Sequence, residues 1–321
     1  MTKFDDQYLD LCERVLIYGE RVSNDPTVLQ KKIAKKTGTN MPNHYAQTIK
    51  PVTTIRLPHQ VLTFDLEEEF PILTSKLVAF KTAVLEMLWI YQVQSNDVRW
   101  LHDRGIKIWD EWELPEDGKY MGKDFKKLYK EKGLKEDFAH TIGTAYGWIT
   151  NRYQLTQSLI ETLKEDPHNR RMVMSLWQNE FLETAALPSC VWNSEWNITD
   201  GRLNVLVNSR SSDIPLGLPF NITQYATLCY LIAHCLDVKP GKMTFVTNDA
   251  HIYENQLPGI REQLKRRDDL RSVGLDLPPA PTLWINPDIK DFFEFDNSKE
   301  LKDIRLMNYN HLGKISMPVS A

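Results

Sequence analysis

The dipeptide Asp200-Gly201 constrains the fold most, because it stands between two segments that both have the composition of β-strands. Residues 190–198 and 202–210 are rich in β-branched and aromatic side chains, which fit the pleated surface of a sheet. An Asp-Gly pair readily adopts the positive φ angles of a two-residue hairpin turn. We therefore predict an antiparallel hairpin over 190–210, preceded by a further strand over 172–177.

Helical segments accompany these strands without a regular alternation. Apolar residues recur at helical spacing in 80–92 and 153–164, whereas 222–236 is apolar nearly all round and predicts a central buried helix. Residues 243–249 and 281–287 predict short strands. Because strands and helices mix irregularly, we predict an α+β fold with a mixed, largely antiparallel β-sheet backed by helices.

The chain shows no repeat of fixed period and no long linker, so residues 1–321 are expected to form a single domain. Two stretches of different composition interrupt the predicted helices and strands. Residues 31–50 are basic and rich in Thr and Asn, which predicts a mobile loop. Residues 115–138 are lysine-rich with few large aliphatic side chains, which predicts an exposed insertion.

Composition argues against several classes of function. A formal net charge of −4 gives no basic field for a nucleic-acid partner, so any anionic ligand must meet a local cluster. The N-terminus lacks an apolar signal segment, and no window is apolar enough for a membrane span. The four cysteines form neither a CxxC pair nor a metal-binding spacing. We therefore expect a cytoplasmic protein without a metal site.

Cys190 is the candidate nucleophile. A cysteine is more often a small buried apolar residue than a catalyst, so the residue type alone is weak evidence. A reactive thiolate needs a nearby positive charge, and the strand across the predicted hairpin ends in Arg210. Antiparallel pairing can bring the two side chains together, which favours a nucleophilic role for Cys190.

Residues 210–221 (RSSDIPLGLPFN) form the least generic stretch of the chain. A cation, two hydroxyls and an acid precede Gly217 and Pro219, and Asn221 follows at the head of the apolar helix. Arginine and serine suit an oxyanion, and a turn before a helix start is a natural anion site. A surface salt bridge with an asparagine cap is the alternative interpretation.

Two residue pairs are weaker signals. Arg170 and Arg171 fit either an anion site or a solvated corner between a helix and a strand. His251 and Tyr253 alternate along a strand-like segment, so their side chains should face the same side.

Taken in order, these segments resemble the thymidylate synthase family from about residue 60 to the C-terminus. The similarity rests on FPILTSK, EMLWI, IWDEW, AYG, NRRM, the Cys190 strand, RSSDIPLGLPFN and DAHIYEN, which follow the family's order. The aliphatic Val191 after the nucleophile is similar to the bacillus and phage branch. The resemblance implies a thymidylate-synthase-type α+β fold that dimerises through its sheet.

The resemblance also implies a methyltransferase that converts dUMP to dTMP, with 5,10-methylenetetrahydrofolate as one-carbon donor and reductant. Cys190 would add to carbon 6 of uracil, Glu86 would organise proton transfers, and Tyr146 would help to remove the proton on carbon 5. The implied catalytic residues are Cys190, Glu86, Tyr146, Arg210, Asp213 and Asn221.

The nucleotide site follows from the same resemblance. Arg210 and Ser211 would hold the 5′-phosphate, and Arg170 and Arg171 would reach it from the other subunit of a homodimer. Asn221 would read the uracil edge in a way that disfavours cytosine. His251 and Tyr253 would bind the ribose 3′-hydroxyl, and Lys36 would contribute from the phosphate loop.

The folate site is implied to be an apolar wall closed by the C-terminal tail. Closure would keep water away while hydride is transferred. The implied folate residues are Trp109, Trp112, Asp213, Leu216, Gly217, Phe220 and the terminal Ala321.

Three positions depart from the family's pattern: Lys36 stands for an arginine, Ser209 for a glutamine, and Ala321 for a larger aliphatic residue. The segments 146–148 and 207–211 are also similar to phage hydroxymethylases, which let water capture the methylene. A dUMP hydroxymethylase is therefore an alternative, although Asn221 argues against the dCMP version. A non-catalytic dUMP- or RNA-binding homologue is the third possibility.

Overall fold

The computed structural model describes residues 2–24 and 52–319. The predicted loop at 31–50, with Lys36, and the terminal Ala321 therefore lie outside the described residues. The helices in the described part are α1 (Lys3–Tyr18), α4 (Phe80–Tyr91), α5 (Arg99–His102), α6 (Phe125–Glu131), α7 (Gly147–Arg152), α8 (Leu155–Glu165), α9 (Gly217–Cys235) and α10 (Leu257–Ser272). Short 3₁₀ segments are η1 (Asp110–Trp112), η2 (Asn179–Thr184), η3 (Glu254–Gln256) and η4 (Phe292–Glu294).

The main sheet of the described residues has seven strands in the order β1-β2-β9-β7-β6-β5, with β8 paired to β9. Its members are β1 (Glu20–Asn24), β2 (Val52–Asp65), β5 (Val173–Ser175), β6 (Val191–Thr199), β7 (Arg202–Ser209), β8 (Ser212–Asp213) and β9 (Lys239–Tyr253). Strand β9 runs parallel to β7 and β8, and the remaining neighbours are antiparallel. The mixed, largely antiparallel α+β architecture predicted from the sequence is confirmed.

The hairpin forms where Asp200-Gly201 predicts it. Thr199 pairs with Arg202 across the turn, and both turn residues have positive φ angles, 52° at Asp200 and 69° at Gly201. Two positive φ angles are the geometry of the turn that matches the twist of antiparallel strands. The register places Val191 opposite Ser209, so the far end of this hairpin carries the residues that flank Cys190 and Arg210.

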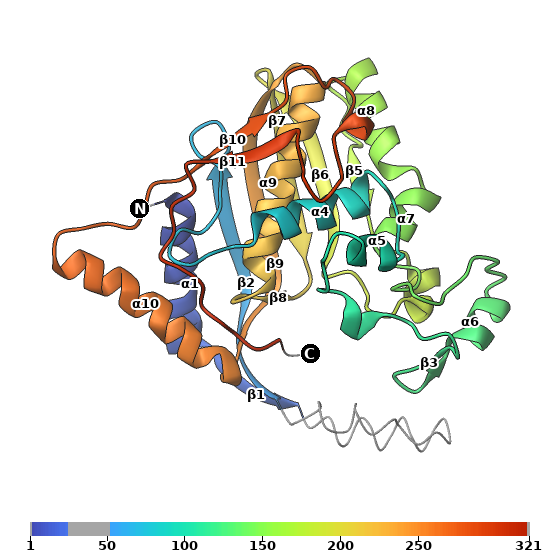
Figure 1. The fold of residues 1–321 in the computed structure, drawn as a ribbon, viewed down its shortest axis with the longest axis horizontal. Coiled ribbons are helices and arrows are strands. Elements are labelled where there is room, and N and C mark those ends of the chain that lie inside the picture. Colours follow the sequence, from blue (N-terminus) through green and yellow to red (C-terminus); the bar gives the residue numbers. More distant parts are fainter. Residues whose placement is uncertain (1, 25–51, 320–321) are drawn as a thin grey trace.

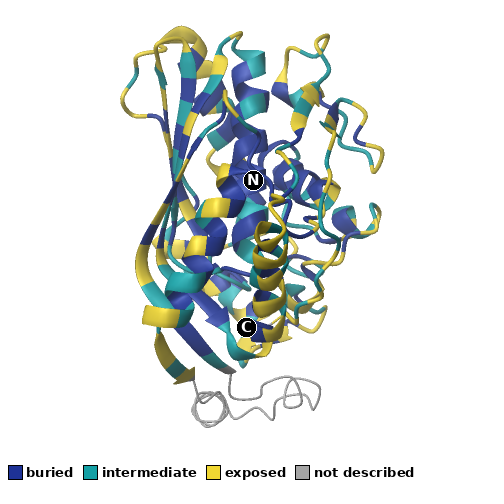
Figure 2. Cartoon of the chain, turned by 90° about the vertical axis from the view of Figure 1, so that its left-hand side faces the viewer, coloured by how far each residue is buried: buried dark blue, intermediate teal, exposed yellow. Residues whose placement is uncertain are grey.

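One face of the sheet is covered by helices, and α9 occupies the centre of the resulting core. Helix α9 lies against β7 and β9, and α4 packs across α9 (Figure 1). Both helices are apolar on nearly every side, as expected for helices enclosed on all sides. Figure 2 shows the strands along one side of the molecule, with buried residues concentrated between them and the helices.

The opposite face of the sheet, here called the outer face, exposes apolar side chains that no other part of the described residues covers. Val61 is 55% exposed and Val173 is 48% exposed, whereas the alternate positions such as Leu62 and Met174 are buried. Successive strand side chains point to opposite faces, so this contrast separates the two sides of the sheet. Among the described residues, no helix is long and apolar enough to cross a membrane.

The lysine-rich stretch 115–138 folds around a small core of its own. A short hairpin, β3 (Lys119–Tyr120) with β4 (Lys123–Asp124), leads into α6. The buried side chains of this core are Leu114, Tyr120, Phe125 and Tyr129. As predicted, the stretch exposes many of its lysine side chains. Its aromatic residues nevertheless pack into a small core, and the low content of aliphatic side chains gave no sign of this core.

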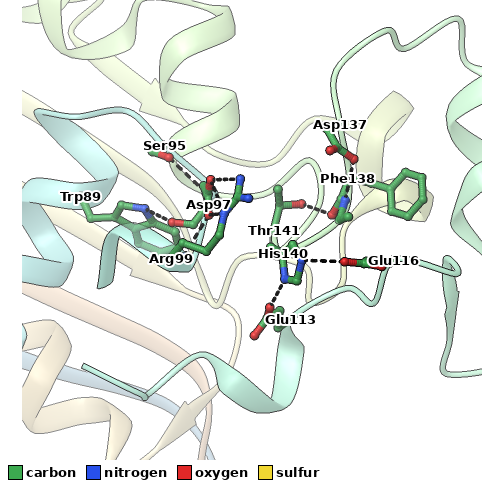
Figure 3. Close-up of polar contacts among 11 residues, drawn as sticks. Trp89, Ser95, Asp97, Arg99, Glu113, Glu116, Asp137, Phe138, His140 and Thr141 are labelled. Carbon is green, nitrogen blue, oxygen red and sulfur yellow. Dashed lines mark hydrogen bonds and ion pairs between the residues drawn. The ribbon is translucent and has the colours of Figure 1, made fainter. Parts of the chain in front are cut away.

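An ion pair between Glu113 and His140 joins the two ends of this stretch to each other (Figure 3). A backbone hydrogen bond joins the stretch to the body of the protein, because the Val98 N–H donates to the His140 carbonyl at 3.0 Å. His140 lies 2.6 Å from a Glu113 oxygen through Nδ1, and this hydrogen bond raises the pKa of the imidazole. Arg99 of α5 pairs with Asp97, whose backbone carbonyl accepts a hydrogen bond of 3.1 Å from Trp89 of α4. The stretch is thus attached beside α4, the helix that carries Glu86.

A further two-stranded sheet, β10 (Thr282–Ile285) with β11 (Ile304–Met307), follows α10. Helix α10 was not predicted, because charged residues lie on all its sides and give no apolar stripe. It nevertheless packs through Leu257 and Ile260, and its first turn supports the C-terminal tail.

Candidate active site

Cys190 and Arg210 meet at the open end of the hairpin. The backbone N–H of Arg210 donates to the carbonyl of Cys190 at 2.9 Å, and Nη2 lies 3.8 Å from the Cys190 Sγ. The guanidinium is fixed beside the thiol, because Nε donates to the Ser189 carbonyl at 3.0 Å and Nη2 to the Pro188 carbonyl at 2.8 Å. The pairing expected from the sequence therefore occurs.

Two opposing effects act on the thiol. Burial raises the pKa of Cys190, because a dehydrated thiolate is unfavourable. The positive charge of Arg210 and the hydroxyl of Tyr146 favour the thiolate and act in the other direction. Among the described residues, Arg210 supplies the adjacent positive charge that favours the thiolate form of Cys190.

Tyr146 is held against Cys190 by an unusual backbone. Its φ is 47°, and the next residue, Gly147, is so close to Ser95 that an added Cβ would lie 1.9 Å from the Ser95 carbonyl oxygen. This constraint directs the Tyr146 hydroxyl to accept a hydrogen bond of 2.9 Å from the Cys190 backbone N–H. Burial raises the pKa of Tyr146 well above its usual value, so the hydroxyl keeps its proton.

Glu86 projects from α4 and is held by two N–H donors. Trp109 Nε1 donates to Oε1 at 2.8 Å, and Gln224 Nε2 donates to Oε2 at 2.7 Å. Dehydration raises the pKa of this carboxyl to about 7, although both hydrogen bonds lower it. A carboxyl that titrates near neutral pH can both accept and return protons.

The raised pKa of Glu86 predicts a pH-dependent stability. The carboxyl ionises at about 7 in the folded protein and near 4.5 when unperturbed, so the stability of the wild type falls as the pH rises from 4.5 through 7. Glu86→Gln removes this loss and should raise the free energy of unfolding by roughly 2 kcal/mol near pH 8.5, but by little near pH 5. Unfolding measured at both pH values checks this, and an equal change at both would contradict it.

An aromatic wall adjoins Glu86. Trp109 contacts Trp112 and Tyr146 edge to face, with ring centroids 5.5 and 5.4 Å apart. Trp109 is buried and Trp112 packs partly buried against the core. The aromatic wall places flat apolar surface next to the Glu86 carboxylate, and this arrangement suits a planar heterocycle.

Asp213 connects this region with the C-terminal tail. Its carboxylate accepts hydrogen bonds from the Leu216 N–H at 3.1 Å and from Gln256 Nε2 at 3.0 Å. Gln256 Nε2 also lies 3.2 Å from the carbonyl oxygen of Pro318. The fully buried Gln256 was not among the residues found from the sequence, because a glutamine after DAHIYEN carries no chemical signal by itself.

The predicted uracil reader, Asn221, is half-buried near the start of α9. Its Nδ2 donates to Gln224 Oε1 at 3.4 Å, and the predicted folate residues Gly217 and Phe220 belong to the same end of the helix. Gln224 was also missed, because it lies within a run that the sequence identifies only as apolar helix.

His251 and Tyr253 of β9 face the same side, as their alternation predicts, with ring centroids 5.0 Å apart. His251 is buried, and its Nδ1 lies 3.5 Å from Asp249. Burial alone would raise the pKa of Asp249, but hydrogen bonds from His251 and Arg56 prevail and lower it to about 2. Ser211 directly follows Arg210 at the same end of the sheet.

Arg170 and Arg171 lie apart from this cluster in the sequence and border the outer face. They are exposed in the loop between α8 and β5. Arg170 lines a groove of about 440 Å³ together with Val173, Glu195 and Leu206 of the sheet. Arg170 therefore lies at the edge of the outer face.

Known proteins match the chain over almost its whole length. A family model for thymidylate synthase matches residues 6–321. The thymidylate synthase of Clostridium beijerinckii is 41% identical over 320 residues, and that of Bacillus licheniformis is 33% identical over 329 residues, each covering 100% of both chains. The solved structure of thermostable thymidylate synthase A from Bacillus subtilis superposes with a TM-score of 0.76 at 30% identity, covering 99% of each chain. With this breadth of similarity and a cysteine held beside an arginine, the chain belongs to the thymidylate synthase family.

Proposed function

We propose that this enzyme methylates dUMP reductively to dTMP, with 5,10-methylenetetrahydrofolate as one-carbon donor and reductant. The observation that carries the proposal is the grouping of Cys190, Arg210 and Tyr146 beside Glu86 and the aromatic wall. The grouping supplies a nucleophile, a cation and two proton-transfer groups around one space.

Cys190 starts the reaction as a thiolate. Its sulfur forms a bond to carbon 6 of uracil, and the electron pair of the 5,6 double bond moves through carbon 5 toward the 4-carbonyl oxygen. Arg210 favours the thiolate before attack through its contact of 3.8 Å with Sγ. Carbon 5 then carries the electron density needed to bond to the one-carbon unit.

Tyr146 and Glu86 manage the proton steps in this proposal. The proton on carbon 5 has to leave before the carbon–sulfur bond can break. The Tyr146 hydroxyl is anchored by the Cys190 N–H and kept protonated by burial, so it would hydrogen-bond a water molecule that accepts this proton. Glu86 titrates near neutral pH and can exchange protons with the 4-carbonyl oxygen.

The residues of the wall and the tail fit a folate. Apolar contact would come from Trp109, Trp112 and Phe220, together with Leu216 and Gly217 at the start of α9. The Asp213 carboxylate would accept hydrogen bonds from ring N–H groups of the folate. The folate supplies the one-carbon unit and the hydride. The tail segment at Pro318, held by Gln256, would exclude water from the space beside the wall.

Substrate recognition is divided among several elements. Arg210 with Ser211 would hold the 5′-phosphate, Asn221 would read the uracil edge, and His251 with Tyr253 would bind the ribose 3′-hydroxyl. Lys36 and Ala321 would complete the phosphate loop and the closed tail. We place the reaction in the cytoplasm, where a thiol such as Cys190 stays reduced.

We also propose that the active form is a homodimer joined through the outer face of the sheet. The support is the exposed apolar surface at Val61 and Val173 and the groove that brings Arg170 to the edge of this face. A second copy seated there would receive Arg170 and Arg171 in its phosphate site. An isologous interface would provide both sites with arginines from the partner subunit.

The mass of the nucleotide product tests the proposed function. Incubation with dUMP and 5,10-methylenetetrahydrofolate should yield dTMP, which is heavier than dUMP by one methylene group. The hydroxymethylated nucleotide contains one further oxygen, and finding it as the main product would overturn the methylation proposal. The related thymidylate synthases favour the first outcome.

Substitution of Asn221 tests the reading of the base. Asn221→Asp should lower kcat/KM for dUMP at least about tenfold and allow turnover of dCMP, because a carboxyl can meet the cytosine edge that the amide cannot. Assays of both nucleotides measure the change, and the exposed Asn151→Asp serves as the matched control. An Asn221→Asp variant that distinguishes the two bases as the parent does would exclude Asn221 as the reader.

A further inference from the structure

Gln224 lies between two groups that the proposed mechanism uses separately. Its side chain is 6% exposed and bridges α9 to α4. The amide nitrogen donates to the Ala83 carbonyl at 3.2 Å and to Glu86 Oε2 at 2.7 Å. The amide oxygen accepts from Asn221 Nδ2 at 3.4 Å.

The backbone of α4 fixes which way this amide points. A carbonyl oxygen such as that of Ala83 can only accept a hydrogen bond, so the Gln224 nitrogen must face α4. The Gln224 oxygen is therefore turned toward Asn221. An oxygen at that position requires the Asn221 nitrogen, because two amide oxygens facing each other would repel.

The fixed orientation of Asn221 matches one base edge and rejects the other. Uracil presents an acceptor at the 4-carbonyl and a donor at N3, which pair with an amide nitrogen and oxygen in that order. Cytosine presents a donor and an acceptor at the same places, so it requires the reversed amide. Reversal would place the Asn221 oxygen against the Gln224 oxygen.

We propose that Gln224 is a positioning residue that sets the base specificity of this enzyme by locking the Asn221 amide in the orientation that reads uracil. The inference rests on the proposed function of Asn221. The Gln224 amide also donates to Glu86 Oε2, so it links the orientation of Asn221 to Glu86. Trp109 Nε1 donates to the other carboxylate oxygen of Glu86. The titratable neighbour of Glu86 across this space is Tyr146, from the start of α7.

Two substitutions separate the roles of the amide. Gln224→Leu removes both the donor to Glu86 and the acceptor for Asn221, with a side chain of similar size. Gln224→Glu keeps an oxygen toward Asn221 but replaces the neutral donor with a carboxyl beside Glu86. Gln224→Met takes the place of Gln224→Leu should the branched side chain prevent folding.

Gln92→Leu is the matched control. Gln92 is a buried amide at the end of α4 that donates to the carbonyls of Phe292 and Phe295 at 3.0 and 2.9 Å. Like Gln224, it holds backbone carbonyls, but its contacts are with the C-terminal segment. The Gln92→Leu variant should be less stable than the wild type, but its preference for dUMP over dCMP and its pH profile of kcat should not change.

The measurements are the binding of dUMP and of dCMP alone by calorimetry, kcat/KM for both, and the pH profile of kcat. Gln224→Leu should lower the ratio of kcat/KM for dUMP to kcat/KM for dCMP at least about tenfold. A loss of this size corresponds roughly to the free energy of one ordinary hydrogen bond. Gln224→Glu should keep the preference within about threefold while lowering kcat. In Gln224→Leu the inflection assigned to Glu86 should move to higher pH, because a hydrogen bond that lowers its pKa is lost.

A folded Gln224→Leu or Gln224→Met variant that retains the full preference for dUMP would overturn the proposal. Equal losses of preference in Gln224→Leu and Gln224→Glu would also overturn it, because orientation through the acceptor oxygen would then not matter. Nucleotide binding without folate requires no turnover. A wild type that binds dUMP selectively but forms no dTMP would therefore contradict the proposed reaction and leave this inference to its own test.

Discussion

Cys190→Ser should reduce the turnover of dUMP by at least about a thousandfold, because a serine hydroxyl is far less ionised than a thiol and attacks carbon 6 poorly. The fold and the binding of dUMP should persist, since the exchange of sulfur for oxygen preserves shape and the contacts of Arg210 are mostly with backbone carbonyls. Steady-state kinetics and calorimetry on the purified variant measure both properties.

Cys235→Ser provides the control for this substitution. Cys235 ends α9, is half-buried, and lies outside the Cys190 cluster, so its replacement should leave kcat within about twofold. Turnover by the Cys190→Ser variant at more than a few per cent of the wild-type rate, in a preparation free of wild-type enzyme, would remove Cys190 from the role of nucleophile.

Mixing two inactive variants should restore activity if arginines are shared between subunits. Arg170→Ala lacks the donated guanidinium and Cys190→Ser lacks the nucleophile. A mixed dimer contains one site with an intact Cys190 and an intact Arg170 from the partner subunit. After complete random exchange of an equal mixture, about a quarter of all sites are intact, so roughly a quarter of the wild-type activity should return.

The control for this mixing experiment pairs two residues that come from the same chain in one site. Glu86→Gln mixed with Cys190→Ser should stay inactive, because no combination of these subunits yields a complete site. Subunit exchange can be followed by the mass of the mixed dimer. Demonstrated exchange without recovered activity in the Arg170→Ala mixture would contradict the shared site.

The sequence predicts those parts of the fold whose cause is local. The Asp200-Gly201 turn needs only its own φ angles, and the hairpin it closes brings Cys190 to Arg210. Helix α9 is predicted because it is apolar on every side, although it begins at Gly217, five residues before the predicted start at Ile222. The family resemblance was based on motifs after residue 60, and the family model extends the match to residue 6.

The parts that the sequence does not predict depend on tertiary contacts. Strand β2 is interrupted by Pro58, yet it pairs with β9 from Thr54 to Asp65. Gln224 and Gln256 have polar partners on segments far away in the chain, so no spacing rule indicates them. Periodicity identifies a buried helix but does not show which of its few polar residues faces the site.

The folate product formed together with dTMP shows whether the one-carbon unit is reduced by the folate or captured by water. If this enzyme uses the folate as both one-carbon donor and reductant, dihydrofolate and dTMP should form in equal amounts throughout the reaction. Simultaneous quantification of nucleotide and folate products by chromatography provides the measurement. Conversion of dUMP with release of tetrahydrofolate and no dihydrofolate would contradict the account, because the methylene would then have been captured by water instead of being reduced.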